Sequence, residues 1–286
     1  EHPSVLSATG EDLSIIPVDG NGQVDLNAAA ELIEAAKPGA LISVMLANNE
    51  TGIVQPVARV AEMAHAQGLT VHCDAVQAAG KMPIRMDSLG ADLLTLSAHK
   101  IGGPQGVGAL IVRDGLELEP LLRGGGQERG RRGGTENVPG IAGFGVAAAE
   151  AVRELDEGPR IAGQRDQLEQ RIREFAPAAS IIGSAVERLP NTSCLTMPGV
   201  DSEVQVMSFD LAGVLVGAGS ACSSGKVGSS HVLEAMDLAP DIARSAIRVS
   251  LGAGTKDDDI DRFVEVWMHL YGRAAETSSH QRAAAL

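Results

Sequence analysis

An amide, an acid and a lysine each follow a short apolar run that predicts a buried strand. Asn49 comes after the first of these runs, Asp74 after the second and Lys100 after the third. In an open α/β sheet the carboxyl ends of the strands meet at one edge, and functional residues lie just beyond them. Taken singly, such an Asp is typical of a helix cap and such a Lys of a solvent-facing side chain. Their joint placement favours a site that carries both signs of charge.

A lysine and an aspartate at neighbouring strand ends are what pyridoxal phosphate chemistry requires. The lysine amine forms a Schiff base with the cofactor, and the carboxylate keeps the pyridine nitrogen protonated so that the ring accepts carbanion electrons. Ser97 and His99, just ahead of Lys100, are placed to hydrogen-bond phosphate oxygens. Gln77 can reach the ring hydroxyl. On spacing alone, this is one interpretation among several.

Two further segments carry residues suited to chemistry on a sulfur-containing or carboxylate substrate. Cys222 lies in a run of tiny residues at 217–225, whereas Cys194 has the apolar neighbours of an inert structural cysteine. The Gly/Ser context of Cys222 suits a nucleophile that must travel, and the alternative is a glycine loop with an incidental thiol. Arg248 interrupts a β-patterned run, where a guanidinium can hold a carboxylate with two hydrogen bonds or form a structural salt bridge.

The order of the predicted elements indicates an α/β protein with a mostly parallel sheet flanked by helices and a smaller C-terminal α+β domain. In the first half, a helix begins near Pro56 and ends at Gly68. Predicted strands of this half are 41–47, 69–73, 92–96 and 108–112. A glycine-rich loop occupies 123–134, and a long helical pattern runs from about 139 to 174.

The last third of the chain mixes shorter strands and helices. Its predicted strands are 193–196, 214–216 and 247–251, and its predicted helices are 202–211, 230–236 and 257–270. This change of character predicts two domains, residues 1–150 and residues 151–286.

Composition excludes several classes of protein. The chain has 286 residues and a net charge of −14, which argues against binding nucleic acid or an anionic membrane through overall charge. No stretch approaches the length of a membrane span, and the segment before Ser7 does not have the pattern of a signal peptide. Aromatic residues make up only 2%, so an aliphatic core is expected. Three cysteines without paired spacing fit a reducing compartment.

The candidate site residues singled out above belong to motifs that are spread over nearly the whole chain. These motifs are EHPSV at 1–5, NNETG at 48–52, DAVQ at 74–77, SAHK at 97–100, GGGQERGRRGGTEN at 124–137, GSACSSG at 219–225 and SAIRVSLG at 245–252. Together, and in this order, they resemble the cysteine desulfurases, class-V enzymes of the fold-type I pyridoxal phosphate family that supply iron–sulfur cluster assembly and nitrogen fixation.

The resemblance implies a role for each matching residue around the cofactor ring. Lys100 would hold the cofactor and move the α-proton, while Asp74 and Gln77 would bind the ring nitrogen and the ring hydroxyl. His2 would stack on the ring face and assist proton transfer. Asn49 would lie beside the ring and near the substrate.

The resemblance also implies how phosphate and substrate are held. Ser97 and His99 would bind the phosphate, joined by Thr135 from the partner subunit of a homodimer. Arg248 would hold the substrate carboxylate. Cys222 would attack the sulfur of L-cysteine, leaving a persulfide on itself and releasing L-alanine.

For the whole protein, the resemblance implies a cytoplasmic homodimer that passes sulfur to an iron–sulfur scaffold protein, with no metal of its own. Relatives carry a Gly/Thr-rich phosphate-binding turn upstream of the position of His2, and nothing precedes Glu1 here. Residues 1–150 are therefore expected to be the C-terminal portion of the large cofactor-binding domain. The alternatives are a selenocysteine lyase, an aminotransferase or another class-V enzyme, or a non-catalytic fragment of such an enzyme.

Overall fold

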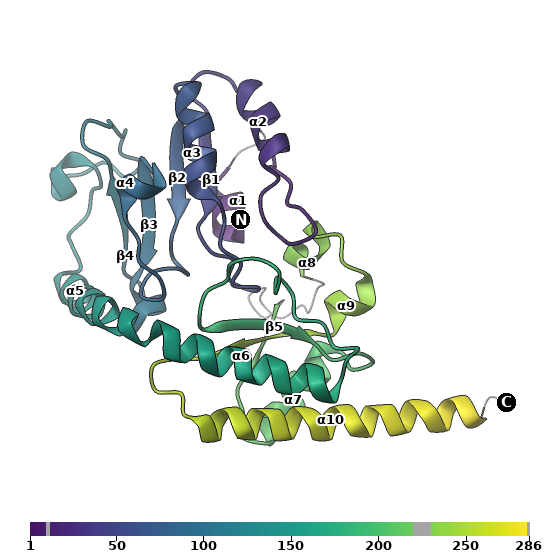
Figure 1. The fold of residues 1–286 in the computed structure, drawn as a ribbon. Coiled ribbons are helices and arrows are strands. Elements are labelled where there is room, and N and C mark those ends of the chain that lie inside the picture. The colour runs from purple at the N-terminus through teal and green to yellow at the C-terminus, as the bar shows by residue number, and fades with distance from the viewer. Residues whose placement is uncertain (10–11, 220–229, 285–286) are drawn as a thin grey trace. The chain divides into compact units, whose positions relative to one another are not determined.

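The computed structural model describes residues 1–9, 12–219 and 230–284 and divides the chain into two compact units (Figure 1). The first unit comprises Glu1–Leu13, Ala29–Leu46 and Pro56–Leu155. The second comprises Ser14–Ala28, Ala47–Gln55 and Asp156–Leu286. A single boundary after residue 150 does not describe this division, because two N-terminal segments belong with the C-terminal residues. Backbone hydrogen bonds hold one of them there, from the Leu189 amide to the Gly52 carbonyl (2.8 Å) and from the Val54 amide to the Glu187 carbonyl (2.9 Å).

The first unit is built on a four-stranded sheet in the order β1-β2-β3-β4. β1, β2 and β3 are parallel, and β4 is antiparallel to β3, so the predicted mostly parallel sheet is confirmed. The strands are β1 (Leu41–Met45), β2 (Thr70–Asp74), β3 (Leu93–Ser97) and β4 (Gly108–Val112). All four lie within two residues of the predicted strands.

Helix α3 (Val57–Ala66) packs on this sheet through one apolar face. Its buried residues are Val57, Val60, Ala61 and Ala64, the i, i+3, i+4 spacing of an amphipathic helix. Pro56 is the N-cap, and Gly68 follows the C-terminus with a φ of +68°, a conformation that glycine adopts without steric cost. The sequence prediction for this helix is therefore confirmed to within two residues.

The region from 138 to 175 contains two helices where the sequence predicts one continuous pattern. α5 (Val138–Arg153) and α6 (Gly158–Phe175) are separated by a 3₁₀ turn, η3 (Glu154–Glu157). Pro159 explains the break, because it lacks the N–H that a continuing helix needs. The other helical elements around the first unit are α1 (Pro3–Leu6), α2 (Leu26–Glu34), α4 (Met86–Leu89), η1 (Ala98–Ile101) and η2 (Gln127–Gly130).

The second unit contains a three-stranded antiparallel sheet in the order β5-β7-β6. Its strands are β5 (Thr192–Thr196), β6 (Gly217–Ala218) and β7 (Ala246–Ser250). The prediction of a strand at 214–216 is wrong, because the residues that pair with β7 are Gly217 and Ala218. Gly217 pairs with Arg248, and a Cβ at Gly217 would lie 3.1 Å from the Arg248 Nη2 atom, so the strand begins where a side chain is absent.

Helices α6 and α10 (Asp257–Ala284) lie side by side against this sheet (Figure 1). α10 extends beyond the predicted range of 257–270. The remaining helices are α7 (Ser202–Leu211), α8 (His231–Ala235) and α9 (Pro240–Arg244). The few aromatic rings concentrate in the otherwise aliphatic core of this unit: Phe209 stacks on Phe263 with ring centroids 5.0 Å apart, and Trp267 is fully buried. The core of the first unit is aliphatic, as the composition predicts.

Candidate active site

The carboxyl edge of the first unit's sheet brings together the acid and the lysine singled out in the sequence. Met45, Asp74 and Thr95 lie at one level of β1, β2 and β3, because the parallel register pairs Met45 with Asp74 and Asp74 with Thr95. The chain leaves the sheet at this level. Gln77 lies in the turn after β2, and Lys100 lies in η1, which begins directly after β3. The predicted juxtaposition is therefore present in the backbone topology.

A row of polar side chains crosses one face of the sheet next to this edge. The His72 ring binds Ser43 Oγ through Nδ1 (2.8 Å) and Thr95 Oγ1 through Nε2 (3.2 Å). Burial lowers the pKa of His72, although the nearby Asp74 charge opposes the shift, so the ring is held neutral. Since side chains alternate along a strand, Asp74 points to the same face as His72. The sequence analysis missed this row, although polar residues inside apolar strands are its visible signal.

Asp74 is a buried carboxylate at the end of the row. Its Oδ1 atom accepts a hydrogen bond from the Val76 amide (2.9 Å), which fixes the carboxyl group at the strand end. Glu1 lies close by: burial raises the pKa of Glu1, and the Asp74 charge raises it further. Two carboxyl groups in one buried region favour a bound cation, and a protonated ring nitrogen is such a group. The carboxyl groups at this edge thus fit a cofactor that carries a protonated pyridine ring.

Ser97, His99 and Lys100 lie at the end of β3, the strand next to β2, and in η1 directly after it. Ser97 Oγ and His99 Nδ1 are 2.8 Å apart and orient one another. His99 and Lys100 are exposed on η1, and Gly102 caps the C-terminus of η1 with a φ of +80°. Among the described residues, Lys100 has no hydrogen-bond or ion-pair partner, so its amine is free to react with a bound carbonyl compound.

Three other predicted cofactor residues belong to the same unit but have local roles in the structure. Gln77 accepts hydrogen bonds from Lys81 Nζ at its backbone carbonyl (2.8 Å) and its side-chain oxygen (3.3 Å), which leaves its amide group as a donor. His2 is the N-cap of α1, where its Nδ1 accepts the Ser4 amide (3.2 Å). Thr135 is exposed in the glycine-rich loop.

Asn49 and Arg248 are brought together in the second unit. Arg248 lies within β7 and donates from Nη1 to the Asn49 carbonyl (2.8 Å). Its Nε atom is buried without a partner among the described residues, and the structure shows no salt bridge between Arg248 and any described carboxylate. The structural salt bridge considered as an alternative is therefore absent from this part of the chain, and donor capacity remains for a ligand.

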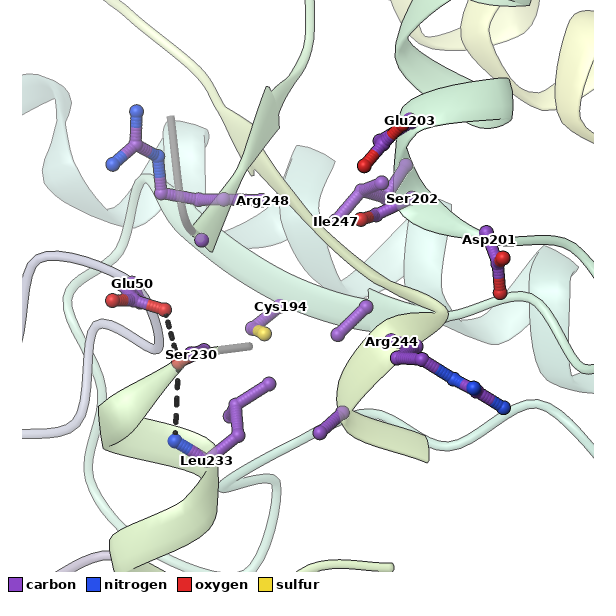
Figure 2. A pocket seen from close by; sticks show the side chains of 13 residues that line it. Glu50, Cys194, Asp201, Ser202, Glu203, Ser230, Leu233, Arg244, Ile247 and Arg248 are labelled. Carbon is purple, nitrogen blue, oxygen red and sulfur yellow. Dashed lines mark hydrogen bonds between the residues drawn. The ribbon is translucent and has the colours of Figure 1, made fainter. Parts of the chain in front are cut away.

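A cavity of about 170 Å³ lies beside Arg248 (Figure 2). Arg248 and Glu50 lie on one side of it, while Arg244 and Asp201 lie on the other. Other residues that line it are Cys194, Ser202, Glu203, Gly219, Ser230, Leu233 and Ile247. The wall therefore combines apolar surface with charges of both signs, which suits a small zwitterionic molecule.

The two described cysteines are unsuited to nucleophilic chemistry. Cys73 and Cys194 are both buried and unpaired, and burial raises the pKa of each thiol to about 12. A thiol in this state has almost no thiolate at neutral pH. The interpretation of Cys194 as inert is confirmed. Cys222 lies in residues 220–229, outside the described residues.

Comparison with known proteins defines the class to which these features belong. The family model described as "Aminotransferase class-V" matches residues 3–263. The NifS-like protein from Rickettsia africae superimposes with a TM-score of 0.86 at 36% identity, covering 95% of this chain and 74% of that one. The fold is therefore that of the class-V, fold-type I enzymes, which depend on pyridoxal phosphate.

Sequence relatives narrow the class further. A cysteine desulfurase of Cereibacter sphaeroides is 45% identical over 93% of this chain and 70% of its own length. The solved structure of SspA in complex with cysteine matches 87% of this chain and 68% of its own, with a TM-score of 0.68 and 34% identity. This chain belongs to the cysteine desulfurase family.

Proposed function

We propose that this protein removes sulfur from L-cysteine with pyridoxal phosphate bound at the carboxyl edge of the β1–β3 sheet. The observation that carries the proposal is the placement of Asp74 and Lys100 on neighbouring strand ends of one parallel sheet. The cysteine bound to SspA supports the choice of substrate. Pyridoxal phosphate supplies an electron sink that makes the substrate α-proton removable.

Each cofactor contact is assigned to a residue of the first unit. Lys100 holds the cofactor covalently and moves the α-proton, because its amine has no competing partner among the described residues. Asp74 holds a proton on the ring nitrogen, and the Gln77 amide donates to the ring hydroxyl. His2 covers the ring, and the Ser97 and His99 pair binds phosphate.

Substrate binding and sulfur transfer are assigned to Asn49, Arg248 and Cys222. Arg248 binds the substrate carboxylate with donors that the protein leaves unused. The Cys222 thiolate attacks the substrate sulfur: an S–S bond forms, the Cβ–S bond breaks, and the electron pair stays on Cβ, where a proton completes the methyl group. The balance is L-cysteine plus the Cys222 thiol giving L-alanine plus the Cys222 persulfide, with no external oxidant.

The test is product analysis with the cofactor-loaded protein. We expect L-alanine and acid-labile sulfide in equal amounts when L-cysteine is supplied with a thiol reductant that releases the persulfide sulfur. Selenocysteine, supplied as a second substrate, tests the alternative that the protein is a selenocysteine lyase. A protein that forms alanine from selenocysteine but none from cysteine, or pyruvate in place of alanine, would contradict the proposal.

We further propose a homodimer in which Thr135 of one subunit binds the phosphate held by the other. The exposed position of Thr135 in the glycine-rich loop supports a role across an interface. Thr135→Ala is expected to weaken cofactor binding about 10- to 100-fold, the effect of losing one hydrogen bond to a charged group.

Mixed dimers test whether Thr135 acts between subunits. A dimer of one Thr135→Ala chain and one Lys100→Ala chain contains one site with both residues intact and one site with neither. We expect about half of the wild-type activity per dimer, measured on tagged heterodimers at a limiting cofactor concentration. If Thr135 served its own subunit, neither site would be intact and the mixed dimer would be as weak as its parents.

We also propose that the sulfur passes to an iron–sulfur scaffold protein in the cytoplasm. The unpaired Cys73 and Cys194 support a reducing compartment. Within the described ranges, no helix combines the length and the apolar character needed to cross a membrane. Transfer of ³⁵S from the persulfide to a purified scaffold protein tests the acceptor, and retention of the label on the enzyme would contradict it.

A further inference from the structure

Glu50 is a buried acid that the roles assigned above leave unused. Glu50 lies in the second unit, and only 4% of the residue is exposed to solvent. Burial raises the pKa of Glu50, while the Ser230 hydroxyl and the charges of His231 and Arg248 oppose that rise. Keeping a carboxyl group in such a place costs free energy unless it is hydrogen-bonded. Its contacts therefore indicate what the residue does.

The Glu50 carboxyl group touches both residues that bound the segment 220–229, here called the Cys222 segment. On the C-terminal side, Ser230 Oγ donates to Glu50 Oε2 (2.6 Å), and the same hydroxyl accepts the Leu233 amide (3.1 Å) as the N-cap of α8 (Figure 2). On the N-terminal side, a Cβ at Gly219 would overlap the same Oε2 atom. One oxygen atom thus meets both ends of the segment.

The turn that carries Glu50 also holds the substrate-binding arginine. Asn49 accepts the hydrogen bond from Arg248 through its backbone carbonyl. Asn48 Oδ1 accepts the backbone amides of Glu50 (2.8 Å) and Thr51 (3.0 Å), which makes the turn rigid. Arg248 and Ser230 are therefore hydrogen-bonded to a single turn, and Gly219 packs against the same carboxyl group.

We propose that Glu50 is a positioning residue for sulfur transfer: its hydrogen bond fixes Ser230, the residue that follows the Cys222 segment, to the turn that also binds Arg248. This inference rests on the proposed function. Attack on the substrate sulfur requires the thiolate within about 3–3.5 Å, and a displacement of about 1 Å costs on the order of 100-fold in rate. Glu50 acts only on the step that consumes the thiol. Removal of the α-proton by Lys100 does not depend on it.

Two substrates separate these steps in the cofactor-loaded protein. L-cysteine needs the Cys222 thiol as sulfur acceptor. L-cysteine sulfinate does not, because its sulfur leaves as sulfur dioxide, the Cβ–S electron pair stays on Cβ, a proton completes alanine, and the dioxide takes up water to give sulfite. The ratio of the two rates of alanine formation isolates positioning of the Cys222 segment from cofactor binding and folding.

We expect Glu50→Ala to lower this ratio about 10- to 100-fold. Ser230→Ala is also expected to lower the ratio. The double variant should have the same ratio as Glu50→Ala, because both changes remove the same hydrogen bond between Ser230 and Glu50. Glu50→Gln restores most of the ratio, because its carbonyl oxygen still accepts the Ser230 hydroxyl. Glu187→Ala is the control, because Glu187 is an exposed acid of the same unit and does not line the cavity.

A readout besides turnover is the fraction of Cys222 that carries an extra sulfur after a single mixing with L-cysteine, measured by mass spectrometry. We expect this fraction to rise more slowly with time in Glu50→Ala, by the same factor as the ratio of the two rates falls. Equal losses with both substrates, or an unchanged ratio, would overturn the role of Glu50. A wild-type protein that releases alanine from the sulfinate but not from cysteine would instead overturn the proposed function, and this inference with it.

Discussion

Lys100→Ala is expected to reduce alanine formation from L-cysteine by at least about 10²- to 10⁴-fold, the contribution of a positioned general acid–base group. The same change removes the covalent link to the cofactor, so the visible absorption of the bound cofactor should be lost on gel filtration. Turnover is measured as alanine released per subunit with excess pyridoxal phosphate present. Under that condition the loss in rate reflects the missing proton transfer and not an empty site.

Lys100→Arg distinguishes chemistry from charge. The guanidinium keeps the positive charge but remains protonated at neutral pH, so it can neither form the link nor accept the α-proton. We expect it to be as inactive as Lys100→Ala. Lys37→Ala is the control, because Lys37 is an exposed lysine of the same unit whose ion pair with Asp12 lies in solvent. Substantial turnover by Lys100→Arg would place the catalytic amine elsewhere.

The sequence predicts the edge that carries Lys100 because its signals are local. Short apolar runs mark the buried strands, and the residues just after them must lie at the carboxyl edge of a parallel sheet. β3 and β4 were predicted within one residue, and α7 was predicted with its observed bounds. Local pattern was enough in these elements, although β4 has no buried residue and α7 buries only Gln205 and Phe209.

The misplaced strand at 214–216 shows where local pattern fails. Val214, Leu215 and Val216 have the side chains that favour strands, but pairing with β7 is decided by what fits opposite Arg248. A residue without a side chain fits there, so the strand begins at Gly217. Pairing between distant segments also explains why residues 47–55 belong with the C-terminal unit, which no composition shift in the sequence indicates.

Glu50 illustrates the same limit within the candidate site. In the sequence it lies between Asn49 and Thr51, in a polar stretch typical of an exposed turn. Its burial follows from contacts with residues roughly 170 to 180 positions later in the chain. Residue type and spacing identify the groups that react, whereas the groups that hold them in place are defined by long-range packing.

Cys222→Ser is the second large effect that we expect. A serine hydroxyl is not ionised at neutral pH and is a poor acceptor of sulfur, so alanine formation from L-cysteine should fall by more than about 10³-fold, as when a catalytic nucleophile is removed. Alanine formation from L-cysteine sulfinate should be retained, because that reaction consumes no thiol. Both rates are measured on the same cofactor-loaded preparation.

The other two cysteines provide the control, since both carry a thiol and both are buried. Burial raises the pKa of Cys73 and Cys194 to about 12, so both thiols remain protonated at neutral pH. Cys73→Ala and Cys194→Ala should therefore leave ³⁵S from L-cysteine on Cys222. Label that persisted on the protein after Cys222→Ser would require a second acceptor, and the high pKa values of these buried thiols argue that neither of them is one.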